Sequence, residues 1–177
     1  MTAEIRVRNN CVRLLEQAVQ VLNGIDDAIY VSTSAVSSHG SIGGHIRHIL
    51  DFYQSFLNGV ASGLINYRMR QRESRLEVDR LAALTRITTT ISALESLSRV
   101  QGNNSLLVST EDGYSSEDMW CQSSLMRELE FLQSHTVHHY SLVAMLLRLH
   151  EIQPDEEFGV APSTLRYWRE KEAACAQ

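Results

Sequence analysis

The distribution of proline restricts the fold of this chain more than any other feature of its sequence. The chain has 177 residues and only two prolines, Pro154 and Pro162, so the first 153 residues contain none. Proline interrupts helices because it lacks a backbone N–H and its ring collides with the preceding turn. In most of the proline-free region, apolar residues recur at steps of three and four, the period of one helix face. The pattern predicts a mostly helical protein.

Four long helices are expected from these apolar patterns. A Ser/Gly-rich segment separates the first two, and Ser41 is suited to cap the second by accepting a backbone N–H. Glycine often ends a helix, and Gly63 and Gly102 follow the second and third patterns. We therefore expect a helix over about Ala3–Ile29, one from the cap Ser41 to a stop at Gly63, and two more over Val78–Leu97 and Leu125–His150.

The remaining segments predict smaller elements. Between the third and fourth helices, Asn103–Ser124 places two apolar runs around a polar turn that contains Asp112-Gly113, which indicates a short β-hairpin or an irregular loop. Near the C-terminus, Pro162 and Ser163 are suited to begin a short fifth helix. With 44% hydrophobic residues, residues 1–177 can bury one core. The expected fold class is all-α, a four-helix bundle in a single domain.

Charge and composition argue against several classes of function. The net charge of −5 does not fit a protein that binds nucleic acid. The longest apolar run, Leu142–Leu147, is too short to span a membrane, and the segment MTAEIRVRNN lacks the apolar stretch of an export signal. Cys11, Cys121 and Cys175 show neither a disulfide framework nor zinc-ribbon spacing. We expect a cytoplasmic protein whose partners are small molecules or protein subunits.

Two histidines lie where a helical core is expected. His135 and His139 continue the apolar stripe that includes Leu129, Leu132 and Leu146 of the fourth predicted helix. Residues four positions apart on a helix have Cβ atoms about 5–6 Å apart on one face. Two neutral imidazoles so placed can reach one metal ion at about 2.0–2.1 Å each. The pair therefore predicts half of a metal site.

A third histidine ligand is available on the second predicted helix. His45 and His48 lie one turn apart there, and five of the seven histidines fall in these two short segments of the chain. The alternative is that the histidines are core residues hydrogen-bonded to backbone or water. The residues alone leave both interpretations open, and they do not decide whether His45 or His48 faces the His135/His139 pair.

The histidine segments carry a family resemblance. SIGGHIRHILDF, followed about ninety residues later by ELEFLQSHTVHHYSL, resembles the DinB/YfiT-like superfamily of small four-helix bundle proteins thought to be metal-dependent enzymes. The likeness covers nearly the whole chain in helix number, order and intervening hairpin. In that family one ligand lies on the second helix, in a context like H-L-x-D that His48 to Asp51 matches here. An H-x-x-x-H motif supplies two more, which implies the ligand set His48, His135 and His139.

The donor set and the resemblance together suggest the cofactor and the reaction class. Three neutral nitrogen donors without a thiolate suit a divalent metal ion, zinc or nickel first, with iron or manganese as alternatives. A three-histidine site leaves coordination positions open, where a metal activates a water or a thiol. The resemblance implies a thiol S-transferase-like enzyme or a hydrolase acting on a small-molecule substrate, with low-molecular-weight thiols among the candidates.

A second hypothesis comes from another class of protein. The chain would be a non-enzymatic helical bundle, a dimeric binding or stress-related protein, in which the histidines are structural. The resemblance makes a homodimer a candidate assembly under either hypothesis, because members of the superfamily often pair through helix faces.

Other polar and aromatic side chains have weaker claims on function. His138 is expected near the site or at its solvent edge, and His39 and His150 at exposed helix ends. Asp51 and Glu128 are candidates to hold a ligand histidine through its second nitrogen, although solvated positions are as consistent with the sequence. The linker before the third helix contains four arginines, Arg68, Arg70, Arg72 and Arg75. They are suited to bind an anionic substrate or to form ion pairs with Glu73, Glu77 and Asp79, and we favour the ion pairs. Trp120, Tyr167 and Trp168 are expected to pack loops against the helices.

Overall fold

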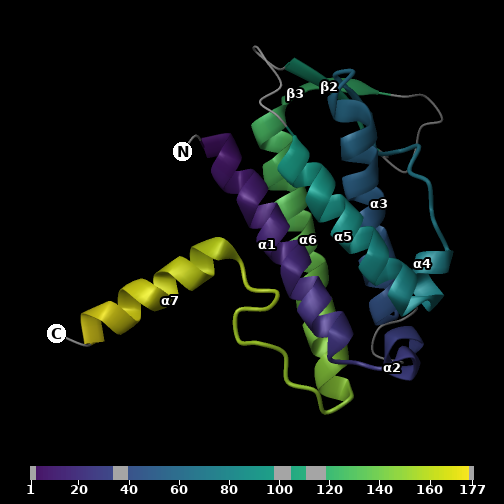
Figure 1. The fold of residues 1–177 in the computed structure, drawn as a ribbon. Coiled ribbons are helices and arrows are strands. Elements are labelled where there is room, and N and C mark those ends of the chain that lie inside the picture. Colours follow the sequence, from purple (N-terminus) through teal and green to yellow (C-terminus); the bar gives the residue numbers. More distant parts are fainter. Residues whose placement is uncertain (1–2, 34–39, 98–104, 111–118, 176–177) are drawn as a thin grey trace.

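The structure is a computed structural model that describes residues 3–33, 40–97, 105–110 and 119–175. It is mostly helical and carries a small three-stranded sheet (Figure 1), so the prediction of a largely helical chain is confirmed. The elements, in chain order, are α1 (Ala3–Asn23), α2 (Asp27–Val31), α3 (Ile42–Val60), β1 (Leu64–Asn66), α4 (Arg75–Val78), α5 (Arg80–Ser96), β2 (Ser105–Ser109), β3 (Trp120–Ser124), α6 (Leu125–Leu149) and α7 (Pro162–Cys175).

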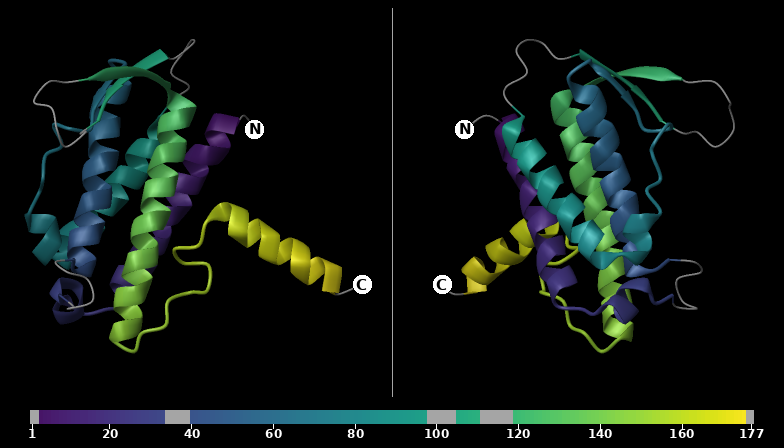
Figure 2. Two further views of the ribbon diagram at one scale, coloured as in Figure 1. Left: turned by 180° about the vertical axis from the view of Figure 1, so that it is seen from behind. Right: turned by 45° about the vertical axis from the view of Figure 1, so that its right-hand side comes forward.

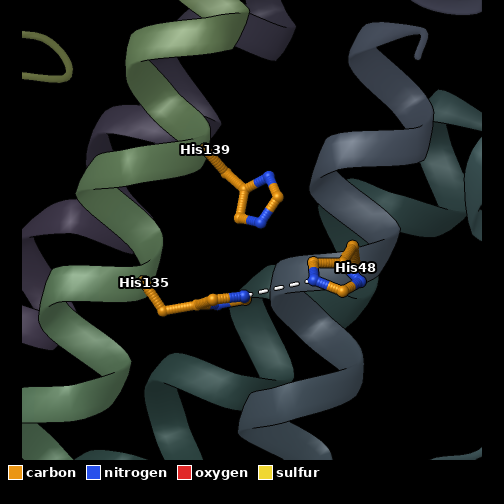
Figure 3. A group of neighbouring side chains, drawn as sticks. All are labelled: His48, His135 and His139. Carbon is orange, nitrogen blue, oxygen red and sulfur yellow. Dashed lines mark hydrogen bonds between the residues drawn. The ribbon is translucent and has the colours of Figure 1, made fainter. Parts of the chain in front are cut away.

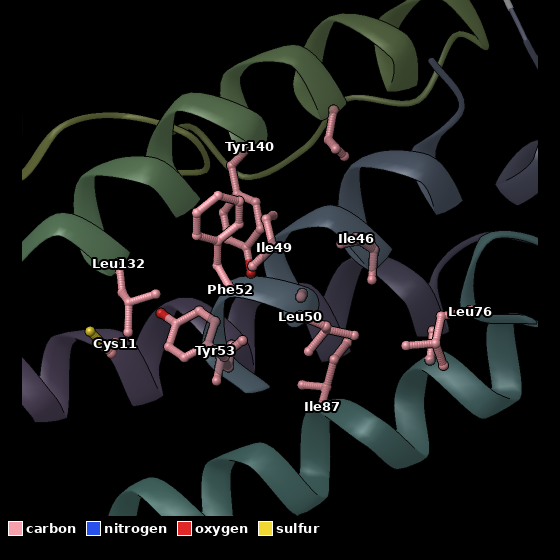
Figure 4. Packing of buried hydrophobic residues seen from close by; sticks show 14 of the residues in the cluster. Cys11, Ile46, Ile49, Leu50, Phe52, Tyr53, Leu76, Ile87, Leu132 and Tyr140 are labelled. Carbon is pink, nitrogen blue, oxygen red and sulfur yellow. The ribbon is translucent and has the colours of Figure 1, made fainter. Parts of the chain in front are cut away.

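The four long helices enclose the core. Helix α1 packs against α5 and α6, and α3 packs against the same two helices from the other side (Figure 2). Each helix therefore directs an apolar face inward. Figure 4 shows this packing, in which Tyr53 and Leu50 of α3 lie among residues of the other helices. The Tyr140 hydroxyl donates to the Leu14 carbonyl oxygen at 2.7 Å, which joins α6 to α1 inside the core.

Two predicted helix boundaries were wrong. The first helix ends at Asn23 instead of Ile29, because the Asp26 side chain accepts from the Ile29 N–H at 2.8 Å and so caps a separate helix, α2. In the same way, Asp79 caps α5 by accepting from the Ala82 N–H at 2.8 Å. The residue before it, Val78, belongs to α4 and is exposed. An aspartate inside an apolar pattern was the sequence signal for both breaks.

The start of α3 was predicted correctly. The Ser41 hydroxyl accepts from the Gly44 N–H at 3.0 Å, and the helix runs from Ile42 to Val60. Gly63 follows with a positive φ of 79°, a conformation that glycine adopts without strain. Gly43 lies where this helix meets α4, so closely that a Cβ atom there would overlap the Glu77 carbonyl oxygen. The absence of a side chain at Gly43 thus sets how close the two helices approach.

The predicted hairpin strands are present, and they belong to a larger sheet. Strands β2 and β3 pair antiparallel, with Ser105 opposite Ser124, whereas residues 111–118, including Asp112-Gly113, lie outside the described part. The sheet also contains β1, which the sequence analysis missed and which pairs parallel with β2. A three-residue strand has too little periodicity to be recognised from sequence. Gly102, the predicted stop of the third helix, also lies outside the described residues.

The C-terminal helix begins at Pro162, as predicted, and extends away from the other helices in Figures 1 and 2. None of its described residues is buried. Tyr167, Trp168 and also Trp120 are exposed, so the prediction that these aromatic rings pack loops against the helices was wrong. Among the helices in the described ranges, none is both long and apolar enough to cross a membrane.

Candidate metal centre

Three histidines from two helices converge between α3 and α6. His48 comes from α3, and His135 and His139 come from successive turns of α6, with all three rings directed into the space between the helices (Figure 3). One nitrogen from each ring can be chosen so that the three atoms lie within 4.8 Å of one another. The structure therefore brings together the three residues that the sequence analysis selected.

The spacing of these nitrogens suits a common ligand. The Nε2 atoms of His48 and His135 are 3.1 Å apart. In a tetrahedral site with metal–nitrogen distances of about 2.0–2.1 Å, neighbouring donor atoms are separated by about 3.3 Å. The His48/His135 pair is already close to that separation, and a nitrogen of His139 lies within 4.8 Å of the other two donor atoms. The residues present thus fit a divalent metal ion.

Aromatic rings hold His135 in place from two directions. Its imidazole lies 4.3 Å from the ring of Phe52 and 5.6 Å from the ring of Phe131, measured between centroids. Its Nδ1 atom is buried and has no hydrogen-bond partner among the described residues. His135 is therefore oriented by packing against these rings and by the contact of its Nε2 atom with Nε2 of His48.

His45, the alternative ligand on α3, lies beside the group. Its Nδ1 atom is 3.0 Å from the Nδ1 atom of His139, so the two rings are within hydrogen-bond distance. It is not among the three residues whose nitrogens lie within 4.8 Å of one another. His45 thus touches one of the candidate ligands and is not itself the third corner of the triangle.

The three imidazoles are held in the neutral form that binds metals. Burial, followed by the positive charge of Arg70, lowers the pKa of His48 to about 4. Burial, followed by the charge of His48, lowers the pKa of His135 to about 4. Burial, followed by the charge of His135, lowers the pKa of His139 to about 3. A neutral imidazole exposes a lone pair, which a metal ion requires.

These low pKa values predict an unusually small release of protons on metal binding. Three imidazoles with ordinary pKa values near 6.5 would together carry about two protons at pH 6, and a bound metal would displace them. The folded protein should release fewer than one from these residues, because all three pKa values lie well below 6. Calorimetry of zinc binding at pH 6 in buffers of different ionisation enthalpy measures this number. A release of two protons would show that the three imidazoles are protonated at pH 6 and would contradict this expectation.

The two candidate carboxylates have partners other than the imidazoles. Asp51 accepts from the Nη1 atom of Arg47 at 2.6 Å, and Glu128 accepts from the Tyr67 hydroxyl at 2.9 Å. Ser123 donates to the second oxygen of Glu128. Both carboxylates are buried, with 3% and 6% exposure, so the solvated positions that the sequence also allowed are wrong. Neither contacts a candidate ligand among the hydrogen bonds of the described residues.

The arginine-rich linker is divided between ion pairs and the candidate centre. Arg75 pairs with Asp79 at 2.9 Å, as predicted. Glu73 and Glu77, however, pair with arginines outside the linker, Arg86 and Arg47. The Arg70 guanidinium lies 4.4 Å from the centre of the Phe52 ring. The same ring also contacts His48 and His135. The sequence offered no signal that Arg70, among the four arginines, would lie against Phe52 and lower the pKa of His48.

The other histidines lie where solvent reaches them or outside the described part. His138 is exposed, and its ring centroid is 5.1 Å from that of His139, which agrees with a position at the solvent edge. His150 caps the C-terminus of α6 and is exposed. His39 lies outside the described residues.

Comparison with known proteins gives one partial likeness. The chain is 33% identical over 105 residues to FK506-binding protein 5 of Rhizopus delemar, an alignment that covers 59% of this chain and 27% of that protein. The chain thus spans about a quarter of the length of the curated relative it matches. No protein-family model matches the sequence. No solved structure matches the fold.

Proposed function

We propose that the chain is a metal-dependent enzyme with an open three-histidine site, built on a DinB/YfiT-like four-helix bundle. The observation that carries the proposal is the convergence of His48, His135 and His139, whose chosen nitrogens lie within 4.8 Å of one another. The pairwise packing of the four long helices is consistent with such a bundle. Zinc or nickel is the favoured ion, with iron or manganese as alternatives, because all three donors are imidazoles.

An open three-histidine site favours reactions that begin with a nucleophile. A divalent metal held by three imidazoles supplies Lewis-acid activation, lowering the pKa of a bound water or thiol to near neutrality. The chain's own contribution is to keep the imidazoles neutral and oriented, through burial and through the packing of Phe52 against His135. This supports a thiol S-transferase-like or hydrolytic reaction on a small molecule.

The charges around the site favour an anionic substrate. The Arg70 guanidinium lies 4.4 Å from the centre of the Phe52 ring, and the centre of that ring is 5.1 Å from that of His48. The charged side chains that lower the pKa of His48, after burial itself, include three arginines, Arg70, Arg47 and Arg72, of which Arg70 has the largest effect. A guanidinium recognises carboxylates well. We therefore propose that small thiols carrying a carboxylate bind better than neutral thiols.

Cobalt-loaded protein tests both parts of the proposal. Cobalt(II) uptake of about one equivalent is expected, and thiol binding then gives a cobalt–thiolate absorption band. The dissociation constant of 3-mercaptopropionate should be lower than that of 2-mercaptoethanol, and Arg70→Gln should reduce this preference by about 3- to 10-fold. Arg75→Gln removes the same charge from an exposed ion pair with Asp79 and serves as the matched control.

The alternative is a non-enzymatic helical protein with structural histidines, and one contact favours it. The 3.1 Å separation of the His48 and His135 Nε2 atoms is also a hydrogen-bond distance, so the pair can satisfy itself without a metal. Under this alternative the purified protein takes up no zinc, nickel, cobalt or iron. If the protein takes up metal but binds the two thiols equally well, the metal centre would be supported and the proposed preference for an anionic substrate would be contradicted.

A further inference from the structure

The contact between His45 and His139 constrains which nitrogen of His139 faces the candidate metal site. The two Nδ1 atoms are 3.0 Å apart, so Nδ1 of His139 is directed at His45. In Figure 3 the other nitrogen of His139, Nε2, is directed toward the region of His48 and His135. One ring nitrogen of His139 is therefore committed to α3 through His45, and the other is directed at the site.

A hydrogen bond between two neutral imidazoles needs one proton between the facing nitrogens. If Nδ1 of His139 carries that proton, Nδ1 of His45 accepts it, and Nε2 of His139 presents a lone pair to the site. If Nδ1 of His45 carries the proton, then Nε2 of neutral His139 is protonated and cannot bind a metal. The direction of this single hydrogen bond thus decides whether His139 is able to act as a ligand.

We propose that His45 is a positioning residue for the metal centre: it accepts a hydrogen bond from Nδ1–H of His139 and holds the Nε2 lone pair of that ring toward the metal. The inference rests on the proposed metal-dependent function. Residues that orient a ligating histidine through its second nitrogen typically contribute 10- to 100-fold to metal affinity. In this chain the carboxylates that might have done so, Asp51 and Glu128, are bound to other side chains.

Two variants at one position separate positioning from other roles. In His45→Asn the amide oxygen takes roughly the place of the imidazole Nδ1 and can still accept from His139. His45→Leu has a similar size and no acceptor. Zinc affinity, measured by competition with a chromophoric chelator, should fall by about 10- to 100-fold in His45→Leu. It should be largely restored in His45→Asn, and both variants should still bind one equivalent at saturation.

The absorption spectrum of bound cobalt distinguishes positioning from ligation. If His45 is a positioning residue, the ligand-field bands of the cobalt-loaded variants should match those of the wild type, because the donors are the same. Equal loss of affinity in both variants with altered bands would show that His45 is a ligand and would overturn the inference. Unchanged zinc affinity in both variants would also overturn it and leave His45 with a packing role.

The tautomer of His139 provides a test that needs no metal. Nitrogen-15 NMR of the imidazoles in chelator-treated wild-type protein should show the proton on Nδ1 of His139, and His45→Leu should shift it toward Nε2. A proton on Nε2 of His139 in the wild type would overturn the inference whether or not the protein binds metal. Failure of the wild type to bind any metal would instead overturn the proposed function. The two failures are thus separate results.

Discussion

Alanine in place of His48, His135 or His139 is expected to reduce zinc binding by at least 100-fold, leaving less than a tenth of an equivalent in protein purified without a chelator. Each variant loses one of three imidazole donors, and the two that remain cannot hold the ion against water and buffer. Elemental mass spectrometry of the purified wild type and variants measures the metal content, and circular dichroism shows whether the helices remain. We expect the helical content to be nearly unchanged, because each of these side chains is only partly buried.

His138→Ala is the matched control for this experiment. It removes the same side chain from the same helix, one residue from His139, at a position that faces solvent. Its metal content should equal that of the wild type. If the wild type contains no metal and takes up none, or if His138→Ala loses as much as the three ligand variants, the three-histidine centre is wrong. In the first case the histidines are structural.

Gly43→Ala is expected to destabilise the fold by about 3 kcal/mol or more, the upper range for forcing extra volume into a packed region. A Cβ atom at Gly43 would overlap the backbone carbonyl oxygen of Glu77, and it would lie 2.8 Å from a ring carbon of Tyr30. Tyr30 cannot move away easily, because it is fully buried and its hydroxyl donates to the Leu76 carbonyl oxygen at 2.5 Å. Urea unfolding followed by circular dichroism measures the loss.

The adjacent glycine provides the comparison. A Cβ atom at Gly44 would meet the Ser41 hydroxyl oxygen at 3.5 Å, an ordinary van der Waals distance. Alanine is also a better helix former than glycine, by up to about 1 kcal/mol. Gly44→Ala should therefore leave the free energy of unfolding unchanged or raise it. Equal destabilisation by the two substitutions would show that the close approach of α3 and α4 does not depend on Gly43.

The sequence predicted the long helices well and their ends less well. The stripe of apolar residues on α6 and the cap at Ser41 depend on neighbours within one or two turns, so they are visible in the sequence. The breaks after Asn23 and before Arg80 depend on aspartates that compete with a continuing apolar pattern. At these two points the local sequence suits a continued helix about as well as a break. In the structure the helix breaks, and the short helices α2 and α4 pack against α3.

The candidate site shows the same division between local and distant information. His135 and His139 share a face because residues four positions apart lie on the same side of an α-helix. By contrast, the distance from His48 to His135 joins residues 87 positions apart in the chain. The stacking of Arg70 on Phe52 and the burial of Glu128 against Tyr67 likewise involve separate elements.

By itself, therefore, the sequence determined which residues lie on the inner faces of the long helices, and it placed two imidazoles together on one of them. Only the tertiary structure decided that His48 completes the triangle while His45 contacts His139 from the side. The physical reason is that helical periodicity sets directions within one helix, whereas the rotation and separation of two helices result from the packing of the whole core.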